Sequence, residues 1–237
     1  MTEPYVIYNG TDSRDIDVIV VKLPDLHRAP ENVDLLKVKG RNGRLEQADG
    51  TCDTYQDSMK INCNGRTLRE VYAWLSGAGW LISSDEPDRR IWVSMHPQAK
   101  NSRFRVNEAC FDTITVTMHC QPFRYFEPDE QPVTVLFSPG EIQNPGTWYS
   151  EPVITIRANG DISVLLGQYQ MDFEGLTDGI VVDCELQECF TLDRTQLMNT
   201  FADIEEFPRL LPGANFIQWS GTGVVESILI ERRCRDK

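Results

Sequence analysis

The sequence contains few of the side chains that most often carry catalysis or bind metals. Its 237 residues include three histidines, His27, His96 and His119, and these lie on separate segments. The chain has no His-Glu-x-x-His pattern, no phosphate-binding Gly-rich loop and no Gly-x-Ser-x-Gly sequence. We therefore predict no catalytic residue, no cofactor site and no metal site, and we do not expect the protein to be an enzyme.

The cysteines lack the spacing of metal ligands. Seven are present, an odd number, and none forms a Cys-x-x-Cys pair or lies at zinc-finger spacing from a histidine. Free cysteine packs as a small hydrophobic side chain. We therefore expect reduced thiols, several of them facing the core.

Positive charge is also scarce. The chain has 23 Lys and Arg against 36 Asp and Glu, a formal net charge of -13. This balance disfavours stable binding to nucleic acid or to anionic lipid, because both need clustered cations. The longest aliphatic run, Val18–Val21, is far shorter than the ~20 residues of a membrane span. The N-terminus, Met1–Pro4, lacks the charge and apolar stretch of a secretory signal, so we expect synthesis in a cytoplasm.

Most of the first half alternates apolar and polar residues with a period of two. From Thr113 to Cys120 the apolar side chains occupy every second position, which predicts a half-buried strand. The segment Ile91–His96 shows a similar alternation and is its expected partner strand. The segment Ile16–Val21 is apolar enough to predict a strand covered on both faces.

One segment has helical spacing instead. Between Thr67 and Leu75 the apolar residues follow an i, i+3, i+4, i+7 pattern, which predicts a short amphipathic helix lying on a sheet. Thr67 and Glu70 are spaced as a capping box at its start. Gly77 and Gly79 are expected to provide a left-handed exit before a strand resumes at Trp80.

The second half also predicts sheet, after a proline-rich and acidic linker at Glu127–Pro132. Short strands with frequent turns favour a β-sandwich. The predicted elements are a strand at Val133–Phe137, a hairpin of Val153–Ala158 and Asp161–Leu166 joined by Asn159-Gly160, a strand at Ile180–Cys189, and a final hairpin of Asn215–Trp219 and Val224–Ile230 joined by Gly221-Thr222-Gly223.

Two chemical alternatives depend on single features of this half. Asp183 and Glu185 would share one strand face, and paired carboxyl groups about 5–10 Å apart are what glycoside cleavage needs. Any polar strand face in so acidic a chain offers such a pair, however. Trp148-Tyr149 in a Pro/Gly-rich turn could stack on a sugar, or could cover the sandwich edge. A monomeric carbohydrate-binding module and a glycosidase therefore remain alternative interpretations.

A polar loop at Lys39–Gly50 contains two strong turn signals, Asn42-Gly43 and Asp49-Gly50. It predicts a projecting hairpin or paired loop. Such a hairpin either contacts a neighbouring molecule or is a solvent-exposed loop without a binding role.

Taken in order, these features resemble the distal tail protein (Dit) family of long-tailed, non-contractile bacteriophages. The resemblance spans nearly the whole chain. Its matching positions are Gly40-Arg41-Asn42-Gly43, Trp74-Leu75 with Gly77 and Gly79, Ser84–Pro87, Cys120–Phe123, Asn144-Pro145-Gly146, Ser150-Glu151-Pro152, Ile180–Asp183, Phe207–Leu210, Pro212-Gly213 with Asn215, and Arg232-Arg233. Lys39 and Glu206 depart from the residues common in that family, a proline and a glycine.

The resemblance implies a mainly β protein with two β-rich domains. Residues 1–128 would form a ring-forming β domain with a helix near 67–76, and residues 129–237 a galectin-like β-sandwich. The implied function is a structural virion protein, a hexameric ring hub at the phage tail tip. It would link the tail tube protein to the tail-tip hub and tail-associated proteins of the baseplate, and to a receptor-binding protein, with no membrane partner. DNA would pass through the ring without stable binding.

A closed ring needs two different patches on each subunit. We hypothesise that one of them includes the turn pair, and that unpaired edge strands of the first domain receive it. The hypothesised interface residues are Gly40, Arg41, Asn42, Gly43, Arg44, Asp49 and Gly50.

Overall fold

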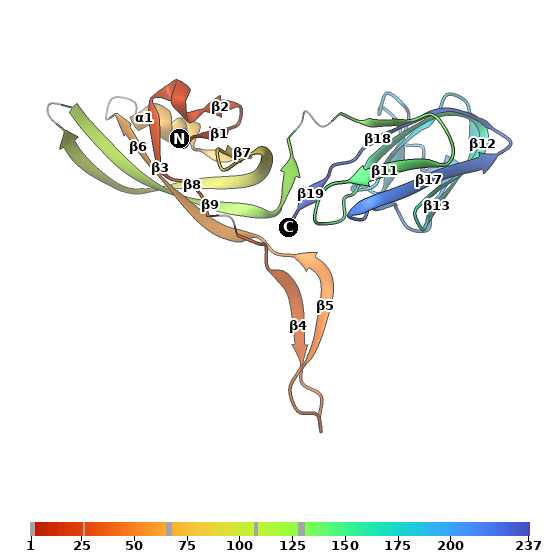
Figure 1. Ribbon diagram of the computed structural model, residues 1–237, viewed down its shortest axis with the longest axis horizontal. Coiled ribbons are helices and arrows are strands. Elements are labelled where there is room, and N and C mark those ends of the chain that lie inside the picture. The colour runs from red at the N-terminus through yellow and green to blue at the C-terminus, as the bar shows by residue number, and fades with distance from the viewer. Residues whose placement is uncertain (1–2, 26, 65–67, 107–108, 128–130) are drawn as a thin grey trace. The chain divides into compact units, whose positions relative to one another are not determined.

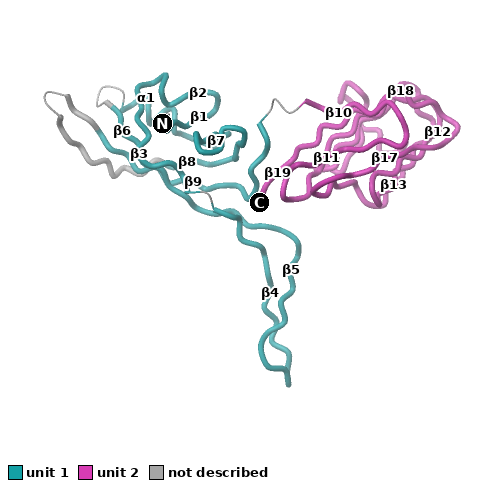
Figure 2. The backbone as a smooth tube through the Cα atoms, viewed as in Figure 1, with its two compact units in different colours: residues 1–127, 237 teal, residues 128–236 magenta. Residues whose placement is uncertain are grey.

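The computed structural model describes residues 3–25, 27–64, 68–106, 109–127 and 131–237. The chain divides into two compact units, shown in different colours in Figure 2. The first unit comprises Met1–Glu127 with Lys237, and the second comprises Pro128–Asp236. Residues 128–130 of the expected linker lie outside the described residues. Within the described residues, no helix is long and apolar enough to cross a membrane.

The first unit is a sheet covered by one helix (Figure 1). Its sheet strands follow the order β2-β1-β7-β8-β9-β6-β3, and β4 and β5 form a separate two-stranded sheet. The elements are β1 (Val6–Tyr8), β2 (Thr11–Asp12), a 3-10 helix (Ser13–Ile16), β3 (Val18–Lys22), β4 (Glu31–Leu36), β5 (Leu45–Cys52), β6 (Tyr55–Asn64), α1 (Leu68–Trp74), β7 (Gly77–Ser83), β8 (Glu86–Val106) and β9 (Ala109–Phe126).

The two alternating segments form neighbouring central strands, as predicted. In β9, Ile114, Val116 and Met118 are fully buried, while the intervening threonines are partly exposed. In β8, Val93 pairs with Cys120 and Met95 with Met118. Because side chains alternate across a strand, this register places the apolar side chains of both strands on the same face, where the core lies.

The predicted helix is also confirmed, as α1. Val71 and Leu75 are fully buried in the core of the first unit, so the helix packs on the sheet through the predicted stripe. Gly77 has the expected positive φ of 89°. Gly79 does not. It lies within β7, where an added Cβ would be 1.7 Å from Asn9 Oδ1, so any larger residue would displace the Asn9 side chain from its hydrogen bond with the Trp80 amide. Thr67 of the predicted capping box lies outside the described residues.

The strand near Ile16–Val21 forms, as β3, but the expectation that both of its faces are covered is wrong. Val18 and Val20 are buried, whereas Ile19 is 61% exposed and Val21 is 53% exposed. The position of β3 in the sheet explains why one of its faces is exposed. β3 ends the strand order, and the single helix of the described first unit packs on the opposite, buried face.

The second unit is a β-sandwich. Its elements are β10 (Val133–Val135), β11 (Gly140–Asn144), β12 (Val153–Leu166), β13 (Tyr169–Leu176), β14 (Ile180–Asp183), β15 (Glu188–Phe190), a 3-10 helix (Asn199–Phe201), β16 (Ala202–Asp203), β17 (Gly213–Gly221), β18 (Val224–Glu231) and β19 (Arg235–Asp236). One layer contains β10, β18, β14 and β15, and the other contains β11, β17, β13 and β16. The core between them includes Ile154, Ile228, Val164, Phe173 and Ile217. Its galectin-like form stays a prediction.

Both hairpins predicted around Asn159-Gly160 and Gly221–Gly223 are wrong. β12 runs through Asn159-Gly160 as one strand, pairing with β18 before Gly160 and with β17 after it. Within the described registers, β17 and β18 pair with β12 rather than with each other. At both places the chain passes from one layer of the sandwich to the other.

Close backbone approach explains the glycines at this corner. The Gly223 amide donates to the Asp161 carbonyl at 2.8 Å. A Cβ on Gly160 would lie 2.9 Å from the Gly223 Cα, and one on Gly221 would lie 2.4 Å from the Asp161 carbonyl oxygen. A glycine marks a tight turn and a close crossing equally well, so the sequence pattern indicated the wrong structure.

The described cysteine side chains are free thiols, as expected. They are Cys52, Cys63, Cys120, Cys184, Cys189 and Cys234, and all except Cys52 are buried. Burial raises the pKa of Cys120 to about 12 and that of Cys189 to about 11. Such thiols remain protonated at neutral pH and are poor nucleophiles.

Candidate functional site: a projecting arm

The predicted projecting hairpin is present and longer than its turn signals indicated. β4 and β5 pair from Leu36 with Leu45 at the outer end to Glu31 with Cys52 at the root. In Figure 1 this pair extends away from the sheet of the first unit. Every residue from Glu31 to Thr51 is exposed. We call residues 31–52 the arm and residues 37–44 its tip.

Five of the seven hypothesised interface residues lie together at the tip, namely Gly40 to Arg44. Gly40 and Gly43 have φ angles of 84° and 81°, a backbone conformation that other residues rarely adopt. Arg41 N donates to the Val38 carbonyl at 3.2 Å, which closes a turn. This turn is centred on Lys39 and Gly40, whereas Asn42 and Gly43 form a bend in the loop that joins β4 to β5.

Asp49 and Gly50 lie elsewhere, so the prediction of a second turn is wrong. They are inside β5, where the register shifts between the Glu31 and Val33 pairs. Asp49 Oδ1 accepts hydrogen bonds from the Thr51 amide and hydroxyl, at 2.8 and 2.7 Å. These bonds hold the pKa of Asp49 below its usual range. This is a β-bulge, a feature that bends a strand without ending it.

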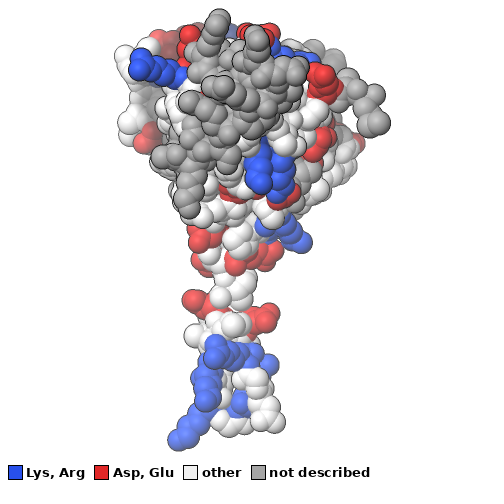
Figure 3. Space-filling view, turned by 90° about the vertical axis from the view of Figure 1, so that its left-hand side faces the viewer, with Lys and Arg blue, Asp and Glu red and all other residues white. Residues whose placement is uncertain are grey.

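The tip is the cationic part of an acidic chain. Lys37, Lys39, Arg41 and Arg44 give it four positive charges with no acid between them. Among the described residues, none of the four forms an ion pair. Figure 3 shows the blue cluster at the end of the arm, with acidic residues nearer the root. An unpaired cluster of one sign attracts a partner surface of the opposite sign.

The stem of the arm carries exposed apolar side chains. Val33 is 40% exposed and Leu35 is 50% exposed, on one face of β4. Leu36 and Leu45 are opposite each other and 45% and 41% exposed. An isolated two-stranded hairpin is marginally stable in water, and apolar residues on it are best accounted for by burial against another surface.

A second exposed apolar surface lies at the edge of the sheet. β3 pairs with β6 on one side, and within the described strands its other edge has no partner. Ile19 projects from it beside an open cleft whose lining includes Glu3, Asp17 and Asn62. Arg14 also lines this cleft, and its charge is paired with Asp12. Unpaired backbone groups, apolar side chains and carboxylates are thus gathered on one edge.

Sequence reasoning missed part of this site. Lys37 and Lys39 belong to the same cationic cluster as Arg41 and Arg44, and four cations within eight residues of an acidic chain were a detectable signal. β4 was missed because none of its residues is buried, so it lacks the alternation by which half-buried strands are recognised.

Comparison with known proteins identifies a solved structure with a similar architecture. No protein-family model and no curated protein sequence matches the chain. Among solved structures, the crystal structure of the Dit protein of SPP1 matches with a TM-score of 0.73 over 97% of this chain and 98% of that chain, at 14% sequence identity. This chain has the fold of SPP1 Dit. That protein is described as a paradigm of the hub adsorption apparatus in phages infecting Gram-positive bacteria.

Within this Dit-like fold, the two acids of the glycosidase hypothesis do not share a strand face. β14 ends at Asp183, and Glu185 lies in the turn before β15. Arg233 reaches both carboxylates, Asp183 at 3.2 Å and Glu185 at 2.8 Å. Asp183 is 5% exposed, and its Oδ1 also accepts from the Glu185 and Leu186 amides. This arrangement stabilises a turn, and the guanidinium occupies the space between the acids.

We predict that Asp183→Ala lowers the free energy of unfolding by about 1.5–3 kcal/mol, the typical value of hydrogen bonds to a charged group. Glu185→Ala is the matched control, because its side chain is 57% exposed and its ion pair is screened by water. Chemical denaturation of both variants measures the difference. Equal losses in the two variants would contradict the assignment of Asp183 as the anchor of the turn.

The aromatic pair that could have stacked on sugar is covered in part. The guanidinium carbons of Arg209 and Arg235 each lie 4.9 Å from the centre of the Tyr149 ring. The rings of Trp148 and Tyr149 lie 5.5 Å apart and are tilted by 33°. Tyr149 is therefore held by arginines and does not offer an open platform for a sugar ring.

Proposed function

We propose that this protein is a structural subunit of a phage tail, six copies of which close into a ring hub at the tail tip. The observation that carries the proposal is the Dit-like fold over nearly the full length of both chains. The fold alone does not set the function. The arm and the exposed edge of β3 supply the second argument, because they are two different surfaces to which no other described strand of the chain is paired.

A cyclic ring needs a contact in which one patch meets a different patch on the next copy. The arm is suited to be the donor patch, since it extends from the sheet and exposes Val33 and Leu35. The edge of β3 is suited to receive it. Ile19 and Val21 would bury the apolar stem, and the carboxylates of Glu3 and Asp17 would attract the cationic tip.

In this proposal the ring links the tail tube protein to the tail-tip hub and tail-associated proteins, and the second unit is available to a receptor-binding protein. The net charge of -13 on each chain opposes retention of DNA that passes through the ring. The protein would be a virion component with no enzymatic role.

The oligomeric state tests this proposal. We expect native mass spectrometry and light scattering over a concentration series to detect a species of about six times the 27.1 kDa chain mass. A standard interface buries about 800 Å² on each partner, and interfaces of that size have dissociation constants that range from micromolar to picomolar. A closed oligomer with a different number of copies would contradict the hexamer. A protein that stays monomeric at all concentrations and binds sugars on a glycan panel would favour the carbohydrate-binding module.

A further inference from the structure

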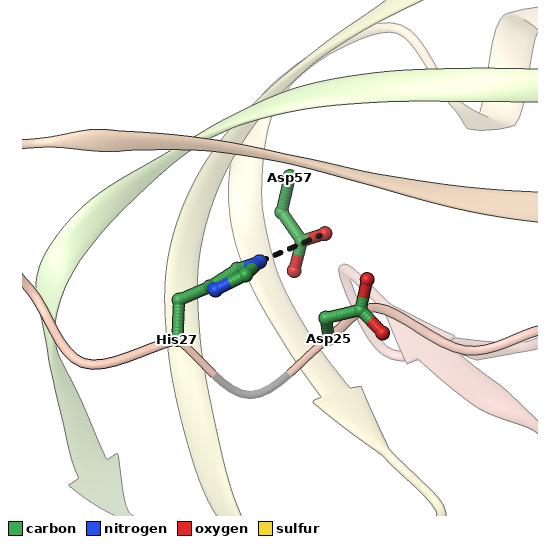
Figure 4. Close-up of side chains that lie close together, drawn as sticks. All are labelled: Asp25, His27 and Asp57. Carbon is green, nitrogen blue, oxygen red and sulfur yellow. Dashed lines mark ion pairs between the residues drawn. The ribbon is translucent and has the colours of Figure 1, made fainter.

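The root of the arm contains a cluster of three possible metal ligands. Asp25 and His27 lie on the segment that leads from β3 into β4, and Asp57 lies on β6, which follows the arm (Figure 4). One ligand atom from each residue lies within 4.8 Å of the others. His27 Nε2 is 4.0 Å from Asp57 Oδ1. The chain therefore brings together an imidazole and two carboxylates from both sides of the arm.

Of these three residues, Asp57 gives the strongest reason to expect a bound cation. Its side chain is 4% exposed, whereas that of His27 is 52% exposed. The Ser58 amide donates to Asp57 Oδ1 at 2.6 Å. Within the described residues, its one ion-pairing partner is His27. A buried carboxylate is unfavourable unless a positive charge compensates it, and here the open side of the carboxylate faces His27.

The cations near the cluster have partners of different kinds. Lys22 Nζ donates to Asp25 Oδ2 at 2.6 Å in a pair whose side chains are about half exposed. Arg89, Arg90 and Arg124 line a hollow that also includes Asp25 and Asp57. Arg124 pairs with Glu86 at 2.9 Å and Arg89 with Asp88 at 2.6 Å, whereas the guanidinium carbon of Arg90 lies 4.3 Å from the centre of the Trp80 ring. Surface pairs such as that of Lys22 are weak, so a divalent ion can compete for Asp25.

We propose that Asp25, His27 and Asp57 bind a divalent transition-metal ion of the Zn²⁺ type. A neutral imidazole nitrogen with carboxylate oxygens is a ligand set that suits these ions, and three protein ligands leave positions for water. Metal–ligand bonds of about 2.0–2.2 Å require the ligand atoms to approach by roughly 1 Å from their present spacing. The side chains of His27 and Asp25 are about half exposed, so they have room for that movement once Asp25 is released from Lys22.

The ion would join the segment entering the arm to the strand leaving it. In the present structure, the Asp53 amide donates to the Pro30 carbonyl at 2.9 Å across the same root. A metal bridge from Asp25 and His27 to Asp57 would add a second connection. The direction in which the arm leaves the sheet would then be fixed by the ion.

Zinc binding to the metal-stripped, full-length protein tests this proposal. The chain has three histidines, and His96 and His119 form an exposed ring pair with centroids 5.6 Å apart, which is the competing site. We expect calorimetry with ZnCl2 to show that His27→Ala weakens binding by about 100-fold or more, since even loss of an outer-shell partner costs 10–100-fold. The matched control, His119→Ala, retains the His27 site.

A second readout locates the ion. With Zn²⁺, amide hydrogen exchange should slow in residues 27–31 and 53–58 of the wild type and of His119→Ala, but not of His27→Ala. His27 is exposed, so its replacement leaves the fold intact, and circular dichroism checks this. The proposal is overturned if the wild type binds no Zn²⁺, or if His119→Ala abolishes binding while His27→Ala preserves it.

Discussion

Reversing two charges at the tip of the arm is expected to disperse the ring. The variant Lys39→Glu/Arg41→Glu changes the net charge of each chain from -13 to -17, since each substitution contributes -2. In the proposed interface these side chains meet Glu3 and Asp17 of the next copy, so attraction becomes repulsion. Like charges brought together at an interface cost several kcal/mol. We expect the protein concentration at which rings form to rise by about 100-fold.

The matched control makes the same change in net charge elsewhere. Arg69 on α1 and Arg157 on β12 are exposed cations that do not belong to the arm. The variant Arg69→Glu/Arg157→Glu also has a net charge of -17, and we expect it to assemble as the wild type does. Light scattering over a concentration series measures both variants. Equal weakening in the two would mean that overall charge, rather than the tip, governs assembly.

Salt should act in the same direction as the charge reversal, and less strongly. The screening length falls from about 10 Å at 0.1 M salt to about 3 Å at 1 M. In the proposed interface, the contacts of Val33 and Leu35 with the edge of β3 would be apolar and would not be screened. We therefore expect high salt to weaken the wild-type ring while leaving part of the association in place.

The second large effect concerns the core of the sandwich. Phe173 is 1% exposed between the two layers of the second unit. Phe173→Ala leaves a cavity, and such replacements cost about 3–5 kcal/mol. We predict that calorimetry shows a lower melting temperature for the second unit and an unchanged transition for the first, because each unit has its own core.

Phe216 provides the control, since it is the same residue type in the same unit and is 60% exposed. Phe216→Ala should change stability by less than about 0.5 kcal/mol. Ring formation by Phe173→Ala should match that of the wild type, because both proposed patches lie in the first unit. Loss of both melting transitions together would show that the units do not fold independently.

Sequence analysis predicted the elements in which one buried face produces a periodic pattern of apolar residues. The Thr113–Cys120 strand and the helix at Leu68–Trp74 were recognised because one face of each is buried. β3 shows the limit of this reasoning. A run of four aliphatic residues indicates a strand, but only the strand order reveals that Ile19 and Val21 lie at an exposed edge.

Glycine signals were less informative, because one residue type serves several purposes. Gly43 lies in a bend of the loop between β4 and β5, whereas Gly50 lies in a bulge and Gly160 in a crossing between layers. The cluster at the arm root could not be predicted either. Asp57 is distant in sequence from Asp25 and His27, and only the pairing of β3 with β6 brings them together.

Electron cryo-microscopy of phage tails that contain this chain tests the central claim most directly. The account predicts a closed ring of six copies at the end of the tail tube, with residues 37–44 of each copy against the β3 edge of the next. A tail tip without such a ring, or a ring in which the arms of all copies point into solvent, would contradict it.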